Sequence, residues 1–231
     1  MKWCFPAFLL SWYSVESMNL NNTVTDEVFF DIRISGDRNN DDWEGRFIVG
    51  IFGDAVPMTA FNFLSLSKGF QHRHEKWHYK GSRIHRILPD SLIQTGDVIL
   101  KDGRSGRSIY APYFIDEDFI HSHKAGGFVG MVSSGMDMND SQFYITLTRA
   151  RWLDNKSVIF GKVVTGMDTV RKIAEVPIYE YNQYPQRDIE ILDCGILSLD
   201  KPYELTENNL NTDEDVKPGP PTTKTISLHE L

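Results

Sequence analysis

The chain has 231 residues, which is enough for one large domain or two small ones. Hydrophobic residues make up 41% and charged residues 24% of it, which excludes a wholly disordered chain, a collagen-like repeat and a disulfide-built miniprotein. The net charge of −8 argues against a broad nucleic-acid-binding face, and no apolar run reaches the roughly 18 residues of a membrane-spanning helix. Two cysteines, Cys4 and Cys194, are too few for a disulfide framework. We therefore expect one globular domain with no membrane span and no nucleic-acid partner.

Residues 1–17 have the pattern of a secretory signal peptide. Lys2 precedes a short, uncharged and largely apolar segment, and the small residues Val15 and Ser17 follow it. A short N-terminal strand or core helix is the alternative, but Pro6 and the missing helical stripe count against it. We expect cleavage after Ser17 and a linker over residues 18–26.

The middle of the chain predicts many short strands and two helices. Alternating apolar and polar residues predict a strand over 27–35, which a polar turn connects to a second strand over 46–52. Pro57 opens a helix in which Phe61, Leu64 and Leu66 have helix-compatible spacing. The remaining predictions are a helix over Met167–Val176 and strands over 84–88, 92–98, 127–132, 142–148, 157–163 and Ile189–Leu197. This pattern indicates a mainly β domain, either a barrel or a sandwich, over residues 27–199.

Residues 200–231 are expected to form an acidic, proline-containing disordered tail, because they cannot bury enough apolar surface to order themselves. The last four residues, Leu228–Leu231, resemble the signals ending in Asp/Glu-Leu that return proteins to the endoplasmic reticulum. A chance Glu-Leu ending is the alternative. With the signal peptide, this ending predicts the lumen of the endoplasmic reticulum, or secretion if the ending is not read.

Three Asn-x-Ser/Thr sequons begin at Asn21, Asn139 and Asn155. Because Asn139 lies in a segment predicted to be structured, Asn21 and Asn155 are the candidates for glycosylation.

Several blocks in a fixed order resemble the cyclophilin family. They are Ile84-His85-Arg86-Ile87, Gln94-Thr95-Gly96-Asp97, Gly103 with Ser108-Ile109-Tyr110, Asn139-Asp140-Ser141-Gln142-Phe143-Tyr144-Ile145, Trp152-Leu153-Asp154, Val158-Ile159-Phe160-Gly161-Lys162-Val163, Gly166-Met167 and Asp193-Cys194-Gly195. The similarity spans residues 27–199. Together with the N-terminal signal, it makes the chain resemble the secretory, cyclophilin B-like members most.

The resemblance implies a closed eight-stranded antiparallel β-barrel capped by two α-helices. It also implies a peptidyl-prolyl cis-trans isomerase that assists folding of secretory proteins without a cofactor. The expected partners are proline-containing peptide segments, with cyclosporin as a candidate ligand, and we expect a monomer.

The resemblance places the catalytic Arg at Arg86 and the Gln on the carbonyl side at Gln94. The peptide-binding surface that it implies comprises Ser91, Leu92, Gly103, Val132, Ser133, Ser134, Gln142, Tyr144, Trp152, Leu153 and Ser157.

Part of this surface departs from the family pattern. Ser91 replaces a Phe that forms one wall of the proline pocket, and Ser157 replaces a His on the far side. Leu92 replaces a Met, Tyr144 replaces the pocket Phe, and 132–134 reads Val-Ser-Ser in place of Ala-Asn-Ala, whose backbone pairs with the substrate. Losing one buried aromatic face removes about 1.5–3 kcal/mol of apolar contact. We therefore expect reduced or selective activity, and a non-catalytic proline-peptide binding module or client-specific chaperone is the alternative.

His72, His74 and His78 lie in a loop that is enlarged relative to the family. Their spacing lacks a fourth ligand for zinc, so we expect no metal site, and the loop could instead set the choice of partner.

Overall fold

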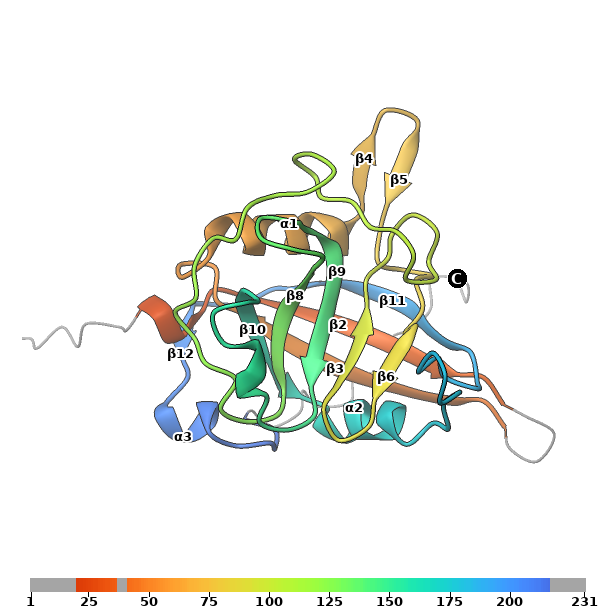
Figure 1. The fold of residues 1–231 in the computed structure, drawn as a ribbon. Helices are drawn as coiled ribbons and strands as arrows, with labels where there is room; N and C mark the ends of the chain where they lie inside the picture. Colours follow the sequence, from red (N-terminus) through yellow and green to blue (C-terminus); the bar gives the residue numbers. More distant parts are fainter. Residues whose placement is uncertain (1–19, 37–40, 217–231) are drawn as a thin grey trace, which may run out of the picture.

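The computed structural model describes residues 20–36 and 41–216 (Figure 1). The predicted signal peptide and the Leu228–Leu231 ending lie outside these residues. One antiparallel sheet has the strand order β11-β2-β3-β10-β8-β9-β7-β6. The strands are β2 Asp26–Ile34, β3 Trp43–Ile51, β6 Arg86–Leu88, β7 Leu92–Thr95, β8 Phe128–Ser133, β9 Asn139–Thr146, β10 Ile159–Thr165 and β11 Ile189–Leu197. Each predicted strand is thus present, with its bounds shifted by a few residues at most.

The sheet curls on itself but does not close into a continuous ladder. Its two edges are β6 and β11, and they meet through the chain that precedes β6. There Arg83 forms an isolated bridge with Glu190, and the Ile84 amide donates to the Ile189 carbonyl at 3.0 Å. The expected closed barrel is therefore wrong, and the sheet is an open, curled half-barrel. The reason is that β6 is only three residues long, and a turn precedes it in which the Ser82 amide donates to the Tyr79 carbonyl.

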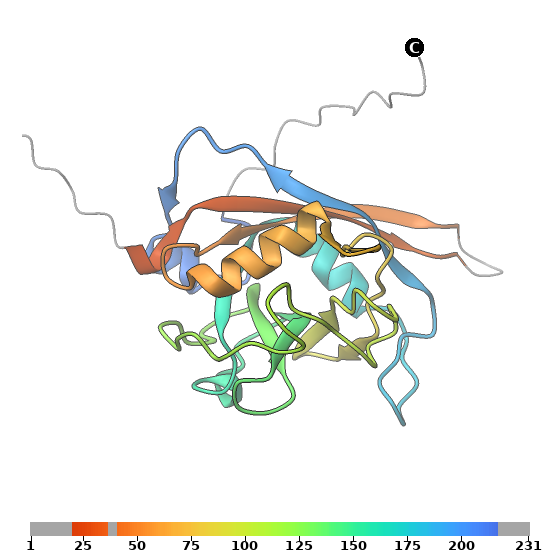
Figure 2. The ribbon, with the colours of Figure 1, turned by 90° about the horizontal axis from the view of Figure 1, so that it is seen from above.

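The helices α1 Pro57–Lys68 and α2 Met167–Ala174 cover opposite ends of the curled sheet (Figure 1). Seen from above, α1 crosses the mouth of the sheet (Figure 2), where it packs on β11 and β9. Pro57 suits the first turn, and the Glu117 carboxylate accepts the Met58 and Thr59 amides at 2.8 Å each. The predicted apolar stripe is partly wrong, because Phe61 is 60% exposed and Phe63 is the buried aromatic residue.

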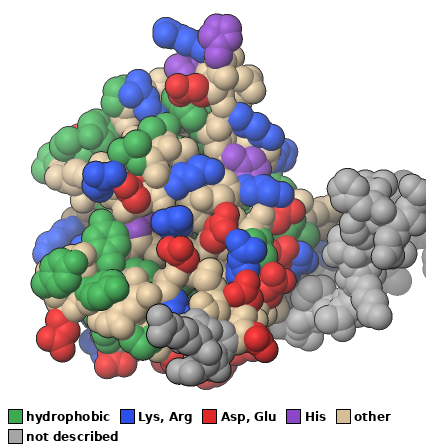
Figure 3. All heavy atoms as spheres, turned by 90° about the vertical axis from the view of Figure 1, so that its right-hand side faces the viewer, with side chains coloured by type: hydrophobic (Ala, Val, Ile, Leu, Met, Phe, Trp, Pro, Cys, Tyr) green, Lys and Arg blue, Asp and Glu red, His purple; other side chains and the backbone are tan. Residues whose placement is uncertain are grey.

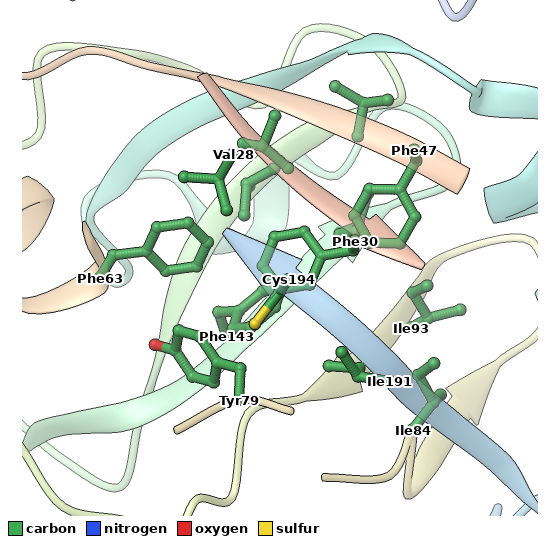
Figure 4. Close-up of a cluster of buried hydrophobic side chains, with 14 of the residues drawn as sticks. Val28, Phe30, Phe47, Phe63, Tyr79, Ile84, Ile93, Phe143, Ile191 and Cys194 are labelled. Carbon is green, nitrogen blue, oxygen red and sulfur yellow. The ribbon is translucent and has the colours of Figure 1, made fainter. Parts of the chain in front are cut away.

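The core inside the curve is an aromatic cluster (Figure 4). The Phe63 ring lies 5.9 Å from Phe30 and 5.1 Å from Phe143, and Tyr79 packs against all three. Such pairs add about 0.5–1.5 kcal/mol each beyond their buried area. Because Phe143 anchors β9 from the core side, its neighbours Gln142 and Tyr144 on the same strand face the other way.

The predicted linker and the predicted tail, which flank the domain, both contain secondary structure. The linker over 18–26 includes the 3-10 helix η1 Leu20–Asn22 and strand β1 Thr23–Val24, which pairs with β12 Tyr203–Glu204. Helix α3 Glu207–Leu210 follows β12, so the described part of the chain has three α-helices instead of the two expected. The disordered-tail prediction is thus wrong for residues 203–210, because Leu205 and Leu210 are buried in a hydrophobic cluster that also contains Val24 and Phe128.

In the described ranges, no helix is long and apolar enough to cross a membrane. Cys194 lies buried in β11, and burial raises the pKa of its thiol to about 12, as expected for an inert cysteine. The Asn139 side chain is fully buried, whereas the sequon residues Asn21 and Asn155 are exposed.

Candidate functional site

A pocket of about 240 Å³ opens on the outer side of β6, β7 and β9. Leu88 lines it together with nine predicted site residues: Arg86, Leu92, Gln94, Val132, Ser133, Tyr144, Trp152, Leu153 and Ser157. We call it the proline pocket. Ser91, Gly103, Ser134 and Gln142 were also predicted, but they lie outside its lining.

Strand register brings the central side chains of the pocket together. Arg86 on β6 is the direct cross-strand partner of Gln94 on β7, and Gln94 is the partner of Tyr144 on β9. Directly opposite residues have Cβ atoms about 4.5–5.5 Å apart and point to the same face of a sheet. A cationic group, an amide and an aromatic ring therefore form one row across three strands.

The Arg86 side chain is exposed and is oriented by a residue that the sequence did not suggest. Its Nε donates to Gln183 Oε1 at 2.8 Å, and the Ile87 amide donates to the Gln183 carbonyl at 3.0 Å. Within the described residues, the terminal nitrogens of the Arg86 guanidinium have no hydrogen-bond partner. They are therefore available to a substrate.

Gln142 supports Gln94 from behind the pocket, and Gly103 lies in the turn beside them. Gln94 Nε2 donates to Gln142 Oε1 at 3.1 Å, and Gln142 Nε2 donates to the Ser105 carbonyl at 3.0 Å. Gly103 has a φ of +87°, and the His85 ring occupies the space that a Cβ would need. Glycine is therefore required at this turn. The side-chain amide of Gln94 has two N–H groups, and because only one of them donates to Gln142, the other is left for a ligand.

The floor of the pocket is a small apolar cluster. The 3-10 helix η2 Arg151–Leu153 leaves Trp152 at the rim, 55% exposed, and buries Leu153 against Leu92 and Tyr144. Val132 packs against the same cluster and narrows the pocket from β8.

A buried chain of polar groups holds the Tyr144 hydroxyl. It lies 2.7 Å from His123 Nε2, and His123 Nδ1 lies 2.8 Å from Asp154 Oδ1. Asp154 also accepts the Ser122 hydroxyl and the His123 amide. Burial lowers the pKa of His123, although Asp154 opposes that shift, so the neutral ring accepts the tyrosine proton at Nε2.

Replacing Tyr144 with Phe should lower the free energy of unfolding by about 1–3 kcal/mol, because it leaves His123 Nε2 buried without a partner. Urea unfolding measures this change. The matched control is Tyr110→Phe, whose hydroxyl donates to the Met58 carbonyl from a 44% exposed side chain and should cost less. Equal losses in the two variants would contradict the role of the buried chain.

Of the four predicted residues outside the pocket lining, Ser91 and Ser134 are the two serines. Ser91 sits on the β6–β7 turn, where its amide donates to the Leu88 carbonyl and its carbonyl accepts the Leu147 amide. Its short side chain does not reach the pocket from this turn. Ser134 lines a neighbouring cavity.

The histidine-rich loop is a hairpin of β4 Phe70–His72 and β5 Glu75–Trp77, in which the His72 ring stacks on Trp77 at 4.4 Å. Lys, Arg and His side chains gather around this protruding hairpin, and acidic side chains lie lower on the same face (Figure 3). Within residues 20–36 and 41–216, no three His, Cys, Asp or Glu side chains are grouped to hold a metal ion. The hairpin is thus a locally basic projection on an acidic chain.

Comparison with known proteins matches the same segment. A family model described as cyclophilin type peptidyl-prolyl cis-trans isomerase/CLD matches residues 29–196, which include every residue of the proline pocket. The peptidyl-prolyl cis-trans isomerase CYP21-1 of Arabidopsis thaliana is 40% identical over 184 residues, covering 78% of this chain and 80% of the relative. A peptidyl-prolyl cis-trans isomerase of Encephalitozoon cuniculi is 41% identical over 170 residues, covering 74% of this chain and 94% of the relative.

Proposed function

The chain belongs to the cyclophilin-type peptidyl-prolyl cis-trans isomerase family and is such an isomerase, and we propose that it acts on proline-containing segments of secretory-pathway proteins at a reduced or selective rate. The observation that carries this proposal is the row of Arg86, Gln94 and Tyr144 over an apolar floor, with only a serine on the turn at position 91.

Isomerisation requires rotation about an Xaa-Pro amide against a barrier of about 18–20 kcal/mol, which comes from amide resonance. No bond breaks, so the residues present suffice for the step. The free guanidinium nitrogens of Arg86 can donate to the prolyl nitrogen as it becomes pyramidal. The remaining N–H of Gln94 can hold the carbonyl, and the apolar floor can hold the proline ring.

The energies show why the pocket matters as much as the arginine. Bringing a step of tens of seconds to milliseconds is about 10⁴-fold, or about 5.4 kcal/mol. One charged hydrogen bond supplies roughly 1.5–3 kcal/mol. The hydrogen bond from Gln94 and contact with the proline ring must supply the rest. A pocket without an aromatic wall at position 91 therefore supports a lower rate or dependence on further contacts.

The test of a reduced rate is Ser91→Phe. If the missing wall limits catalysis, this variant should raise kcat/KM for an Ala-Pro peptide about 10- to 100-fold, which corresponds to 1.5–3 kcal/mol of restored contact. Exchange NMR of the cis and trans signals measures it, and Ser91→Ala is the control that should show no gain. An unchanged rate in Ser91→Phe would refute the assignment of a reduced rate to this position.

The secretory location is supported by the N-terminal pattern over 1–17 and by the Leu228–Leu231 ending. When the full chain is expressed in eukaryotic cells, it should be retained and should co-localise with the endoplasmic reticulum. Deleting Leu228–Leu231 should move it into the medium. A chain that keeps residues 1–17 and resides in the cytosol would contradict this location.

A further inference from the structure

A second and larger cavity, of about 730 Å³, lies next to the proline pocket. The two share Ser133, Leu153 and Ser157 as lining residues. We call the second cavity the side pocket. We propose that the side pocket binds a large apolar side chain of the substrate, Leu, Met, Phe or Trp, located within two residues of the proline. This inference rests on the proposed function, because it assumes that the substrate proline occupies the proline pocket.

The boundary between the two pockets is made of short side chains. Ser133 and Ser157 stand where the cyclophilin pattern has an Asn and a His, and both line both pockets. Because serine is smaller than asparagine or histidine, less side-chain volume separates the proline pocket from the side pocket. The same substitutions that remove contacts from the proline therefore open a path for a neighbouring side chain.

The side pocket offers apolar contact. Leu153 forms part of the shared wall, and Phe119 lies partly buried against the main core. Met136 borders the cavity and is 86% exposed, more than any other large hydrophobic residue in the described part of the chain. An exposed methionine beside a binding pocket is typical of a surface that accepts apolar partners of variable shape.

The acidic groups of the side pocket are already engaged. Asp116 Oδ2 accepts the Asp137 amide at 3.0 Å, and Asp137 Oδ1 accepts the Asp116 amide at 2.9 Å. Asn139 Nδ2 donates to Asp116 Oδ1 at 2.8 Å. These contacts hold the loop that carries Met136, so an apolar occupant would not deprive the carboxylates of their partners. The lining also contains Lys156, so its formal charge is −1, from two carboxylates and one lysine, and this charge disfavours an acidic side chain.

Peptide geometry limits where the side chain can come from. In an extended chain, residues advance about 3.3 Å each and alternate sides, so the residue two positions from the proline faces the same side. The experiment scans the residues on both sides of the proline.

The experiment compares eight-residue peptides with one proline, in which each of the two positions on either side carries Ala, Leu, Phe, Arg or Glu in turn. Exchange NMR gives kcat/KM with the full-length protein, and titration of the ¹³C-methyl signal of Met136 reports binding independently of turnover. At one position, Leu or Phe should bind at least tenfold more tightly than Ala and Glu, and the Met136 methyl should shift only with those peptides.

Variants then assign the preference to the side pocket. Met136→Ser should reduce the preference for Phe over Ala about three- to tenfold, and Met136→Leu should retain it. Met58→Ser is the matched control, because Met58 is an exposed methionine on α1 that lines neither pocket. It should leave the preference unchanged.

The outcomes separate this inference from the proposed function. Isomerisation of all peptides with no apolar preference, or with Arg preferred to Phe, would overturn the side-pocket assignment and leave the isomerase intact. A Phe preference in binding with no faster exchange would support the side pocket and contradict catalysis.

Discussion

Replacing Arg86 with Ala should lower kcat/KM for an Xaa-Pro peptide about 10- to 100-fold and leave the fold intact. The expected loss is the 1.5–3 kcal/mol of one charged hydrogen bond that forms only as the prolyl nitrogen becomes pyramidal. The side chain is exposed, and its one partner among the described residues, Gln183, is only partly buried, so its removal leaves no fully buried group unpaired. Exchange NMR measures the rate, and the urea midpoint checks the fold.

The matched control is Arg83→Ala, which removes an exposed arginine that pairs with Asp188 outside the proline pocket. Its kcat/KM should stay within twofold of the wild type. Gln183→Ala should fall between the two, because it frees the Arg86 guanidinium without removing it. A rate unaffected by Arg86→Ala would mean that the row of polar side chains is not the catalytic site.

The stability of the protein should rise with pH between 8 and 10.5 through Lys162. This side chain is 1% exposed, and its Nζ donates to the carbonyls of Gly126 at 2.7 Å and Thr212 at 3.0 Å. Burial lowers its pKa from 10.5 to about 8, although Asp213 opposes the shift. Between these pH values the unfolded chain binds a proton that the folded chain does not, so the free energy of unfolding increases with pH, by about 3–4 kcal/mol in all.

Other groups titrate in the same pH range, so the prediction concerns the difference in the free energy of unfolding between the wild type and a variant without this lysine. The free energy of unfolding of the wild type, minus that of Lys162→Met, should increase as the pH rises from 7.5 to 10. The matched control is Lys172→Met, which removes a half-exposed lysine of α2 paired with Glu175, and this difference should stay nearly flat. A wild-type curve parallel to that of Lys162→Met would show that the buried amine does not titrate in this window.

The sequence predicted the strands of the sheet well, because each is a short local segment rich in apolar residues, and β2 also alternates between buried and partly exposed side chains. Strand β11 matches its prediction residue for residue at Ile189–Leu197. The helix α1 shows the limit of this reasoning. Its start at Pro57 was predicted. Which aromatic residue faces the core depends on how the helix lies across the sheet, and Phe63 is buried there instead of Phe61.

The elements that the sequence missed are stabilised by contacts distant in the chain. Strand β12 is two residues long and exists because it pairs with β1, about 180 residues earlier. Apolar residues are too few in this segment to indicate packing from the sequence, although Leu205 and Leu210 are both buried. Composition therefore suggested disorder where tertiary contacts provide order.

The residues that line the candidate site were mostly predicted, but the residues that hold them in place were not. Nine pocket residues followed from the family resemblance, whereas Gln183, His123 and Asp154 have no spacing that relates them to the residues they hold. The only indication of such a supporting residue in the sequence is Tyr144, which replaces the Phe of the family, because a buried hydroxyl needs a hydrogen-bond partner. That requirement identifies the need for a residue such as His123 without locating it.

The most direct test of the account is exchange NMR of an Ala-Pro peptide with the full-length protein, recorded with amide shifts of β6, β7 and β9. Faster cis-trans exchange, together with shifts confined to the strands that carry Arg86, Gln94 and Tyr144, is the predicted result. Shifts at these strands with exchange no faster than in free peptide would contradict catalysis and leave a proline-binding module.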